Sequence, residues 1–340
     1  MGNPIMPHRL RAFTLVELLV VITIIAILMA IILPSLSGAQ GAAREAKERK
    51  QLGDVNTAWK TWATSHHNAY PIPGLVRRQR FDVNGNGVDS SDPFVMGSGR
   101  EEALWNDHAS VLSLCIMENL LSPEQLVSPN EYSDLVYAYD SYDYKVLGAS
   151  DGDDTEKWDR GFSNDLLGQH AGYCHNSYAI MPLAGERRRD QWDRPGDSSF
   201  VVVATRGPLE GDATLLNEEV DDNGTVTTPA SNTAFLMAKA GAWRGILVYA
   251  DGHTDIADGF YPQGSTYERV ESDDGPSLTL PDNIFKGDVE PDVPYQSQTL
   301  ELLGRDILLT HTDYDENDTS SWFSESEINP SDITFTPLHD

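Results

Sequence analysis

The chain has 340 residues and a formal net charge of −29, and this length can bury one large core or two modest ones. The charge is uneven, because residues 1–80 hold 10 Lys and Arg against 4 Asp and Glu, whereas residues 81–340 hold 14 against 49. The acidic part would repel phosphate backbones, which argues against nucleic acid as a partner, and it would attract cations such as calcium.

The N-terminal segment combines a short basic leader, residues 1–12, with an apolar run from Phe13 to Leu33. At 1.5 Å rise per residue, the run would form a helix of about 30 Å, which is the thickness of a bilayer's hydrocarbon core. Its one carboxylate is Glu17, and Pro34 follows it directly. A charge in the middle of a bilayer costs about 2.5 kcal/mol or more, so we expect Glu17 to have a specific role.

Two ordinary explanations of this segment have to be weighed. A secretory signal could be cleaved after Ser37-Gly-Ala39, but the apolar region of such a signal is typically about 7–15 residues long. A plain signal anchor explains the length but not the Phe-Thr-Leu-Val-Glu string. Basic residues occur on both sides of the run, so their distribution does not settle the orientation.

The string Arg11-Ala-Phe-Thr-Leu-Val-Glu17, followed by an apolar run, resembles the N-terminus of type IV pilins and type II secretion pseudopilins. The resemblance implies that a prepilin peptidase cleaves between Ala12 and Phe13 and that Phe13 is then N-methylated. It also implies that Glu17 is the family's characteristic glutamate and that Pro34 is its helix-bending proline, both serving assembly. Ala12 departs from the Gly that the family most often has before the cut.

The resemblance further implies a location and a fold. The chain would be a single-pass protein of the inner (cytoplasmic) membrane, with its C-terminal domain extracytoplasmic, either in the periplasm or in a surface fibre. We expect an α+β fold, in which a long N-terminal helix packs on an antiparallel β-sheet with large loop insertions. The expected divisions are a leader (1–12), the transmembrane half (13–34) and the amphipathic half (35–68) of the helix, a pilin-like ectodomain (69–260) and an acidic, partly ordered C-terminal extension (261–340).

The helix is expected to continue from Ser35 to about His67. The mixed-charge stretch from Arg44 to Lys50, which includes Glu48, is predicted to be solvated. Beyond it, apolar residues recur at three- and four-residue spacing, which predicts an amphipathic face that packs against the sheet. The residues of this face are Leu52, Val55, Trp59, Trp62 and Ala63.

An acidic loop follows at residues 82–92. Its alternating carboxylates and amides, with Gly at the sixth place, resemble the calcium loops of EF-hand and dockerin type. Pro93 occupies the twelfth place, where such loops have a bidentate acid. The loop is therefore either a Ca²⁺ site, the one cofactor that the sequence suggests, or a plain Asn-Gly turn. The candidate ligands are Asp82, Asn84, Asn86, Asp89 and Asp92.

The cysteines and histidines suggest no enzyme. Cys115 and Cys174 are the two cysteines, and they could form a disulfide or remain two buried thiols. His170 and Cys174-His175 lack a second ligand pair at zinc-finger spacing. The sequence contains no His-Glu-x-x-His zinc motif and no Gly-x-x-x-x-Gly-Lys phosphate-binding loop.

Stretches rich in β-branched and aromatic residues predict strands at 176–180, 199–204 and 243–256. Asp251-Gly252 predicts a hairpin turn within the last stretch, and His253 is expected to stabilise that turn. The order of these strands resembles the C-terminal region of large pilin-like proteins. Those families commonly place a histidine where this chain has Gly241, so no role tied to that histidine is carried over.

These features favour a structural pseudopilin- or pilin-like subunit, assembled into a type II secretion or type IV pilus-like fibre. The expected partners are the prepilin peptidase/N-methyltransferase, other pilin-like subunits and the inner membrane. Two alternatives remain open. The chain could be a membrane-anchored binding or display module that uses its N-terminus only for export, or it could be a minor subunit at the fibre tip.

Overall fold

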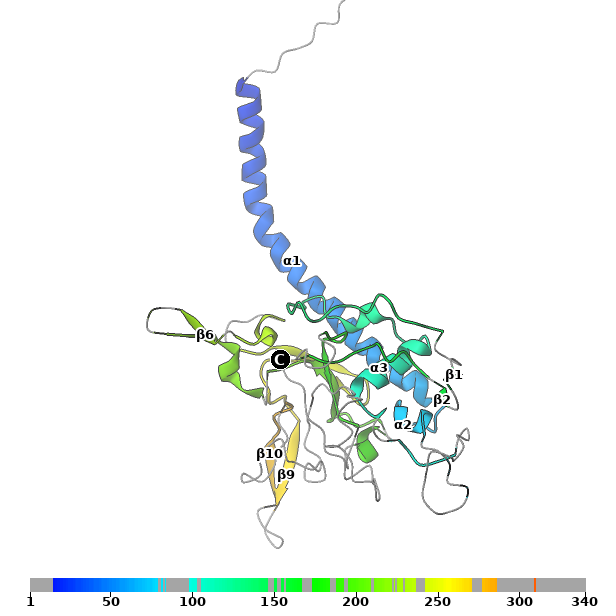
Figure 1. Cartoon of the computed structure of the whole chain (residues 1–340). Coiled ribbons are helices and arrows are strands. Elements are labelled where there is room, and N and C mark those ends of the chain that lie inside the picture. Colours follow the sequence, from blue (N-terminus) through cyan, green and yellow to red (C-terminus); the bar gives the residue numbers. More distant parts are fainter. Residues whose placement is uncertain are drawn as a thin grey trace, which may run out of the picture. The chain divides into compact units, whose positions relative to one another are not determined.

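The computed structural model describes residues 15–285, with gaps, together with Leu309 (Figure 1). The chain divides into two compact units, Met1–Ala46 and Lys47–Asp340, and the second unit is called the head below. The gaps within 15–285 are 79–80, 82, 84–97, 103–104, 146–149, 152–153, 156, 167–172, 184–187, 193–194, 209–210, 222, 224, 229, 237–241 and 271–276.

The long N-terminal helix, α1, runs without interruption through Leu15–Ala63 (Figure 1). It continues through Pro34, which has no N–H to donate to the preceding turn. Near this proline the hydroxyl groups of Ser35 and Ser37 donate to backbone carbonyls three residues earlier, at 2.8 and 2.9 Å. The helix ends at Ala63, before the predicted His67. A turn follows, in which His67 and Asn68 take left-handed backbone conformations with φ of 55° and 64°.

A four-stranded antiparallel sheet forms the centre of the head, in the order β3-β4-β7-β8. The strand predictions are confirmed, and β7 and β8 form the hairpin that Asp251-Gly252 indicated. Together with α1, this sheet gives the predicted α+β, pilin-like layout. The four strands are β3 (Tyr178–Ile180), β4 (Val201–Thr205), β7 (Gly245–Tyr249) and β8 (Thr254–Ala257).

Shorter elements surround the sheet. Helix α3 (His108–Met117) is capped at its N-terminus by the Asp107 carboxylate, which accepts from the backbone N–H of Ser110 at 2.8 Å. A capping box between Ser122 and Gln125 starts a single 3-10 turn. The remaining helices and strands are α2 (Pro73–Val76), α3 (His108–Met117), β1 (Ser150–Asp151), β2 (Asp154–Thr155), β5 (Glu219–Val220), β6 (Val226–Thr228), β9 (Thr266–Val270) and β10 (Ser277–Pro281).

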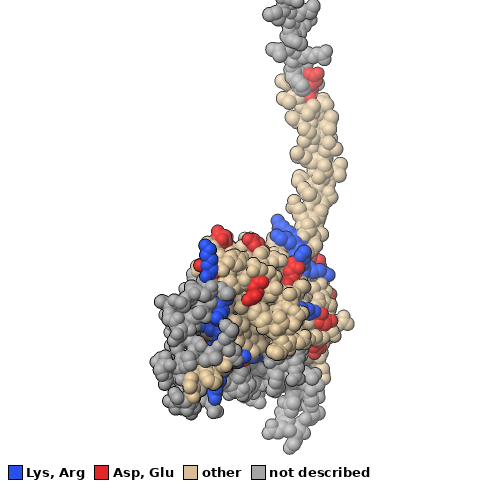
Figure 2. Space-filling view, turned by 90° about the vertical axis from the view of Figure 1, so that its right-hand side faces the viewer, with Lys and Arg blue, Asp and Glu red and all other residues tan. Residues whose placement is uncertain are grey.

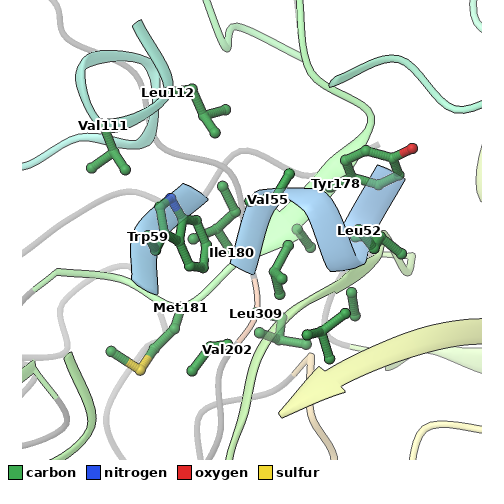
Figure 3. Close-up of a cluster of buried hydrophobic side chains, with 14 of the residues drawn as sticks. Leu52, Val55, Trp59, Val111, Leu112, Tyr178, Ile180, Met181, Val202 and Leu309 are labelled. Carbon is green, nitrogen blue, oxygen red and sulfur yellow. The ribbon is translucent and has the colours of Figure 1, made fainter. Parts of the chain in front are cut away.

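The core of the head lies where the C-terminal part of α1 meets the sheet and α3 (Figure 3). The predicted apolar face of α1 is buried, with Trp59 fully enclosed and Trp62 7% exposed. Trp59 packs against the rings of Tyr70 and Trp192, with centroid distances of 5.6 and 4.7 Å. The other residues labelled around it are Leu52, Val55, Val111, Leu112, Tyr178, Ile180, Met181, Val202 and Leu309.

Residues from the acidic C-terminal part contribute to the same core. Ile284, Phe285 and Leu309 are all buried. The backbone N–H of Leu309 donates to the carbonyl of Ile284 at 2.7 Å, and that of Ile284 donates to Phe260 at 3.1 Å. Short apolar pieces of an otherwise acidic sequence thus stabilise the head by burial.

Candidate functional site

The first part of α1 exposes apolar side chains along its length. Leu15 is 79% exposed, Leu36 is 47% exposed, and the large apolar residues between them are similarly uncovered. Between Glu17 and Arg44 the sequence has no charged residue, and Figure 2 shows this uninterrupted uncharged surface. Among the described residues, α1 is the one helix long and apolar enough to cross a membrane. Such a surface is unstable in water and requires lipid or other apolar helices around it.

Both predicted assembly residues lie on this helix. Glu17 is in the first turn of α1, where the partial positive charge of the helix N-terminus favours a carboxylate. Pro34 lies inside the helix. The predicted cleavage-site residues, Ala12 and Phe13, lie outside the described residues.

The basic residues of α1 follow the apolar stretch, as Figure 2 shows. Arg44, Lys47 and Lys50 are exposed, as predicted for a solvated stretch. Lys50 pairs with Asp54 one turn later at 2.5 Å, and an exposed pair of this kind contributes little to stability.

Glu48 corrects the prediction that this whole stretch is solvated, because its side chain is fully buried. Its carboxylate accepts hydrogen bonds from Asn130 at 2.8 Å, from Ser128 at 3.0 Å and from Thr205 of β4 at 2.8 Å. Burial raises the pKa of Glu48 above its ordinary value; the three hydrogen bonds oppose the rise, and the charge of Glu131 adds to it. Glu48 therefore connects α1 to the sheet through neutral donors.

A buried ion pair lies next to this carboxylate. Arg206, which follows β4, binds Glu131 through both of its terminal nitrogens, at 2.5 and 2.9 Å. Ser177 also donates to Glu131, at 2.6 Å. Burial alone would raise the pKa of Glu131, but the hydrogen bonds and charge of Arg206 lower it below its usual value. Removing one partner would leave an uncompensated buried charge.

The Asp-Gly-His hairpin forms the second attachment of α1. The Lys60 ammonium donates to the backbone carbonyl of Asp251, and Gly252 has a φ of 92°, which favours glycine. A side chain at position 252 would collide with Lys60. In the same region Asn56 donates to the Tyr70 hydroxyl, which in turn donates to the carbonyl of Ala250, at 3.1 and 3.0 Å.

His253 interacts with this turn. Its backbone N–H donates to the Asp251 carboxylate at 3.0 Å, and its ring Nδ1 lies 2.6 Å from the same oxygen. The ring also stacks on Tyr249, with centroids 4.1 Å apart and planes 8° apart. Burial tends to raise the pKa of Asp251, but the His253 hydrogen bonds and the Lys60 charge bring it below its ordinary value. These contacts make His253 part of the turn.

The other predicted sites have different outcomes. The candidate calcium ligands, Asp82, Asn84, Asn86, Asp89 and Asp92, lie outside the described residues. Cys115 and Cys174 are both buried free thiols, the second of the two alternatives that the sequence left open. The Cys174 thiol lies 3.1 Å from the carbonyl of Asn176. Within the described part of the chain, no group of three His, Cys, Asp or Glu residues is placed to hold a metal ion.

The buried polar residues were missed by sequence reasoning. Glu48 lies four positions before Leu52 and seven before Val55, so helical periodicity places it on the buried face. The place of Glu48 in this helical pattern is therefore the signal from which its burial could have been predicted. Glu131 and Arg206 are 75 residues apart, and the sequence carries no local signal of their pairing.

A sequence model described as "Prokaryotic N-terminal methylation motif" matches residues 8–33. The chain has a prepilin-type N-terminus. The matched range includes Ala12, Phe13 and Glu17, and it overlaps the exposed apolar part of α1. It does not extend to the head. The comparisons with curated proteins and with solved structures give no match.

Proposed function

We propose that the chain is a structural subunit of a pilin-like fibre of the type II secretion or type IV pilus kind. The observation that carries this proposal is the exposed apolar part of α1, which coincides with the methylation motif at residues 8–33. In the membrane this surface contacts lipid, and in a fibre it packs against the same surface of neighbouring subunits. The apolar surface is then buried in both states.

Processing prepares the N-terminus for the transfer from the membrane to the fibre. A prepilin peptidase cleaves between Ala12 and Phe13, and Phe13 is N-methylated. Glu17 then neutralises the methylated amine of a neighbouring subunit, because an unpaired carboxylate in an apolar bundle is unfavourable. The head remains extracytoplasmic, and the fibre role requires no catalytic activity.

Mass spectrometry of the mature protein tests the processing step. We expect a chain that begins at N-methyl-Phe13. An Ala12→Gly variant should be processed at least as efficiently, because it restores the residue that pilin-like proteins most often have before the cut. A mature chain that begins at Gln40, after a Ser-Gly-Ala site, would contradict the proposal.

Fractionation of cells tests assembly. Wild type should be present both in the membrane and in sheared surface filaments or secretion-system fibres. Glu17→Ala should leave the protein in the membrane but abolish its incorporation into fibres, whereas Glu17→Asp, which keeps the carboxylate, should retain part of it.

The size and acidity of the head favour two further candidates, a display module and a minor subunit at the fibre tip. The head begins at Lys47, and residues 81–340 carry a net charge of −35, so adjacent copies would repel one another along a fibre. Wild-type protein that never leaves the membrane fraction would favour the display module. Protein present in fibres at very low copy number would favour the tip subunit.

A further inference from the structure

A cluster of aromatic rings surrounds the buried imidazole of His175. The ring of Tyr139 stacks on it with centroids 4.6 Å apart and planes 22° apart. Tyr137, Tyr173 and Phe162 lie at 5.1, 4.9 and 5.4 Å from the same imidazole. We call these five residues the His175 cluster.

Backbone pairing fixes the cluster in place. Cys174 is bridged to Val136 on one side and to Asn164 on the other. The backbone N–H of Tyr137 donates to the carbonyl of Cys174 at 3.1 Å, and that of His175 donates to Ser163 at 2.8 Å. The rings are therefore carried by segments that are hydrogen-bonded to one another.

The two ring nitrogens of His175 differ in their hydrogen bonding. Its Nδ1 lies 3.0 Å from the carbonyl of Tyr137, and a carbonyl only accepts, so Nδ1 carries the proton. Burial lowers the pKa of His175, which keeps the ring neutral. Its Nε2 is buried and has no hydrogen-bond partner among the described residues. Nε2 is therefore a hydrogen-bond acceptor that lies among the aromatic rings, in a residue that is only 1% exposed.

Three carboxylates lie near the cluster. The charges of Asp140 and Asp159 act on His175, and those of Asp159 and Asp143 act on Tyr139. Asp159 accepts backbone N–H groups with both oxygens, at 2.8 Å each, whereas the side chains of Asp140 and Asp143 lie at the exposed surface. Within the described part of the chain, none of these three carboxylates forms an ion pair with a Lys or Arg.

We propose that the His175 cluster and its acidic rim bind a guanidinium or ammonium group carried by a basic peptide segment of a partner protein. Aromatic faces attract cations, and Tyr137 leaves 46% of its surface exposed. Carboxylates on the rim neutralise the bound charge, and the planar guanidinium of arginine can stack on a tyrosine and donate to oxygen or nitrogen acceptors at the same time. A neutral ligand would remove water from the same carboxylates but would bring no positive charge to balance them, which is unfavourable.

The test has to distinguish binding at the cluster from general attraction, because the acidic head attracts any polycation. The probe is fluorescein-labelled hexa-arginine, and its binding to the full chain in neutral detergent micelles is measured by fluorescence anisotropy. The measurement is made at physiological ionic strength, at which long-range attraction is screened beyond about 8 Å. We expect saturable binding that hexa-glutamate does not reproduce.

Paired variants separate the cluster from general acidity. Tyr137→Leu should weaken binding about three- to fivefold, while Tyr137→Phe, which keeps the ring, should bind as wild type does. Asp140→Asn should weaken binding by a similar factor. The controls are Tyr261→Leu, which removes another exposed tyrosine, and Glu218→Gln, which makes the same charge change elsewhere on the surface; both should bind as wild type does.

Specific outcomes overturn the proposal. It fails if hexa-arginine does not bind, if Tyr137→Leu weakens binding no more than Tyr261→Leu does, or if Glu218→Gln weakens it as much as Asp140→Asn does. It also fails if neutral chitohexaose displaces the peptide, which would make the cluster a carbohydrate site. Asp140→Asn changes only an exposed side chain, so it provides the test even if Tyr137→Leu does not fold. Because the probe is added to detergent-solubilised subunits, the result does not depend on fibre assembly.

Discussion

The two parts of α1 use apolar residues in opposite ways. The part in the first unit exposes them, as Leu15 and Leu36 show, whereas the part in the head buries Leu52, Val55 and Trp59 almost completely. Both parts belong to one continuous helix. The difference shows that apolar composition alone does not decide burial. Between Glu17 and Arg44 the exposed part has no charged residue, whereas the part in the head has an exposed face that carries Lys47 and Lys50.

The carboxylates of the helix show the same contrast. Glu17 is at the N-terminal end of the uncharged part, while Glu48 is enclosed by three donors in the head. We therefore expect variants in the first part to change anchoring and assembly, and variants in the second part to change the stability of the head. The seven tryptophans lie at or after residue 59, so their fluorescence during denaturant unfolding reports on the head.

The largest effect is expected for a deletion in the buried part. Trp59→Ala should lower the free energy of unfolding of the head by about 3–5 kcal/mol, because it removes a fully buried ring from an aromatic cluster. Leu28→Ala, in the exposed part, should leave this free energy unchanged. If the two variants destabilise the head equally, the contrast between the two parts is wrong.

The two carboxylates provide the second test. Glu48→Ala should lower the free energy of unfolding by about 2–3 kcal/mol, since it leaves the donors Ser128, Asn130 and Thr205 without their acceptor. Glu17→Ala should have no measurable effect on the same denaturation curve. A stable Glu48→Ala protein would mean that water replaces the carboxylate in this network.

The pH dependence of stability tests the role of Glu48. Its folded-state pKa is raised above the ordinary value of 4.5, so the folded protein binds this proton more tightly than the unfolded chain does. The contribution of Glu48 to stability is then largest below pH 4.5 and declines as pH rises through the raised pKa. Wild type should lose stability relative to Glu48→Gln over that range.

Denaturation of both proteins at a series of pH values measures this difference. Glu131 contributes with the opposite sign, because its pKa is lowered and its stabilisation is lost as pH falls. Both proteins retain Glu131, so its contribution largely cancels in the comparison. A difference that stays constant with pH would show that Glu48 does not titrate differently in the folded and unfolded states.

The smallest effect concerns the hairpin attachment. Lys60→Met should destabilise the head by about 0.5–1 kcal/mol, because it removes the hydrogen bond to the carbonyl of Asp251 but keeps most of the side chain's apolar stem. The control is Lys50→Met, which removes an exposed pair with Asp54 and should change stability by about 0–0.5 kcal/mol. Equal values for the two variants would show that the Lys60 contact does not stabilise the head.

Several features could be predicted from local patterns in the sequence. The apolar run from Phe13 to Leu33 predicts a helix able to span a membrane, the spacing of Leu52, Val55 and Trp59 predicts a buried face, and Asp251-Gly252 predicts a hairpin. Each of these signals spans a short stretch of sequence. Over such a stretch, side-chain periodicity and the residue preferences of turns are sufficient to predict the local structure. The α+β layout was what the resemblance to pilin-like proteins implied.

Which polar residues are enclosed depends on contacts between segments that are far apart in the sequence. Glu48 and Thr205 are 157 residues apart, and Glu131 and Arg206 are 75 residues apart. The partner of a buried charge depends on which distant segments the fold brings together, and a run of mixed charges such as Arg44–Lys50 has the same composition whether or not one member is buried. For the same reason the rings that surround His175 could not be assigned from the sequence, because they come from separate segments joined by backbone pairing around Cys174.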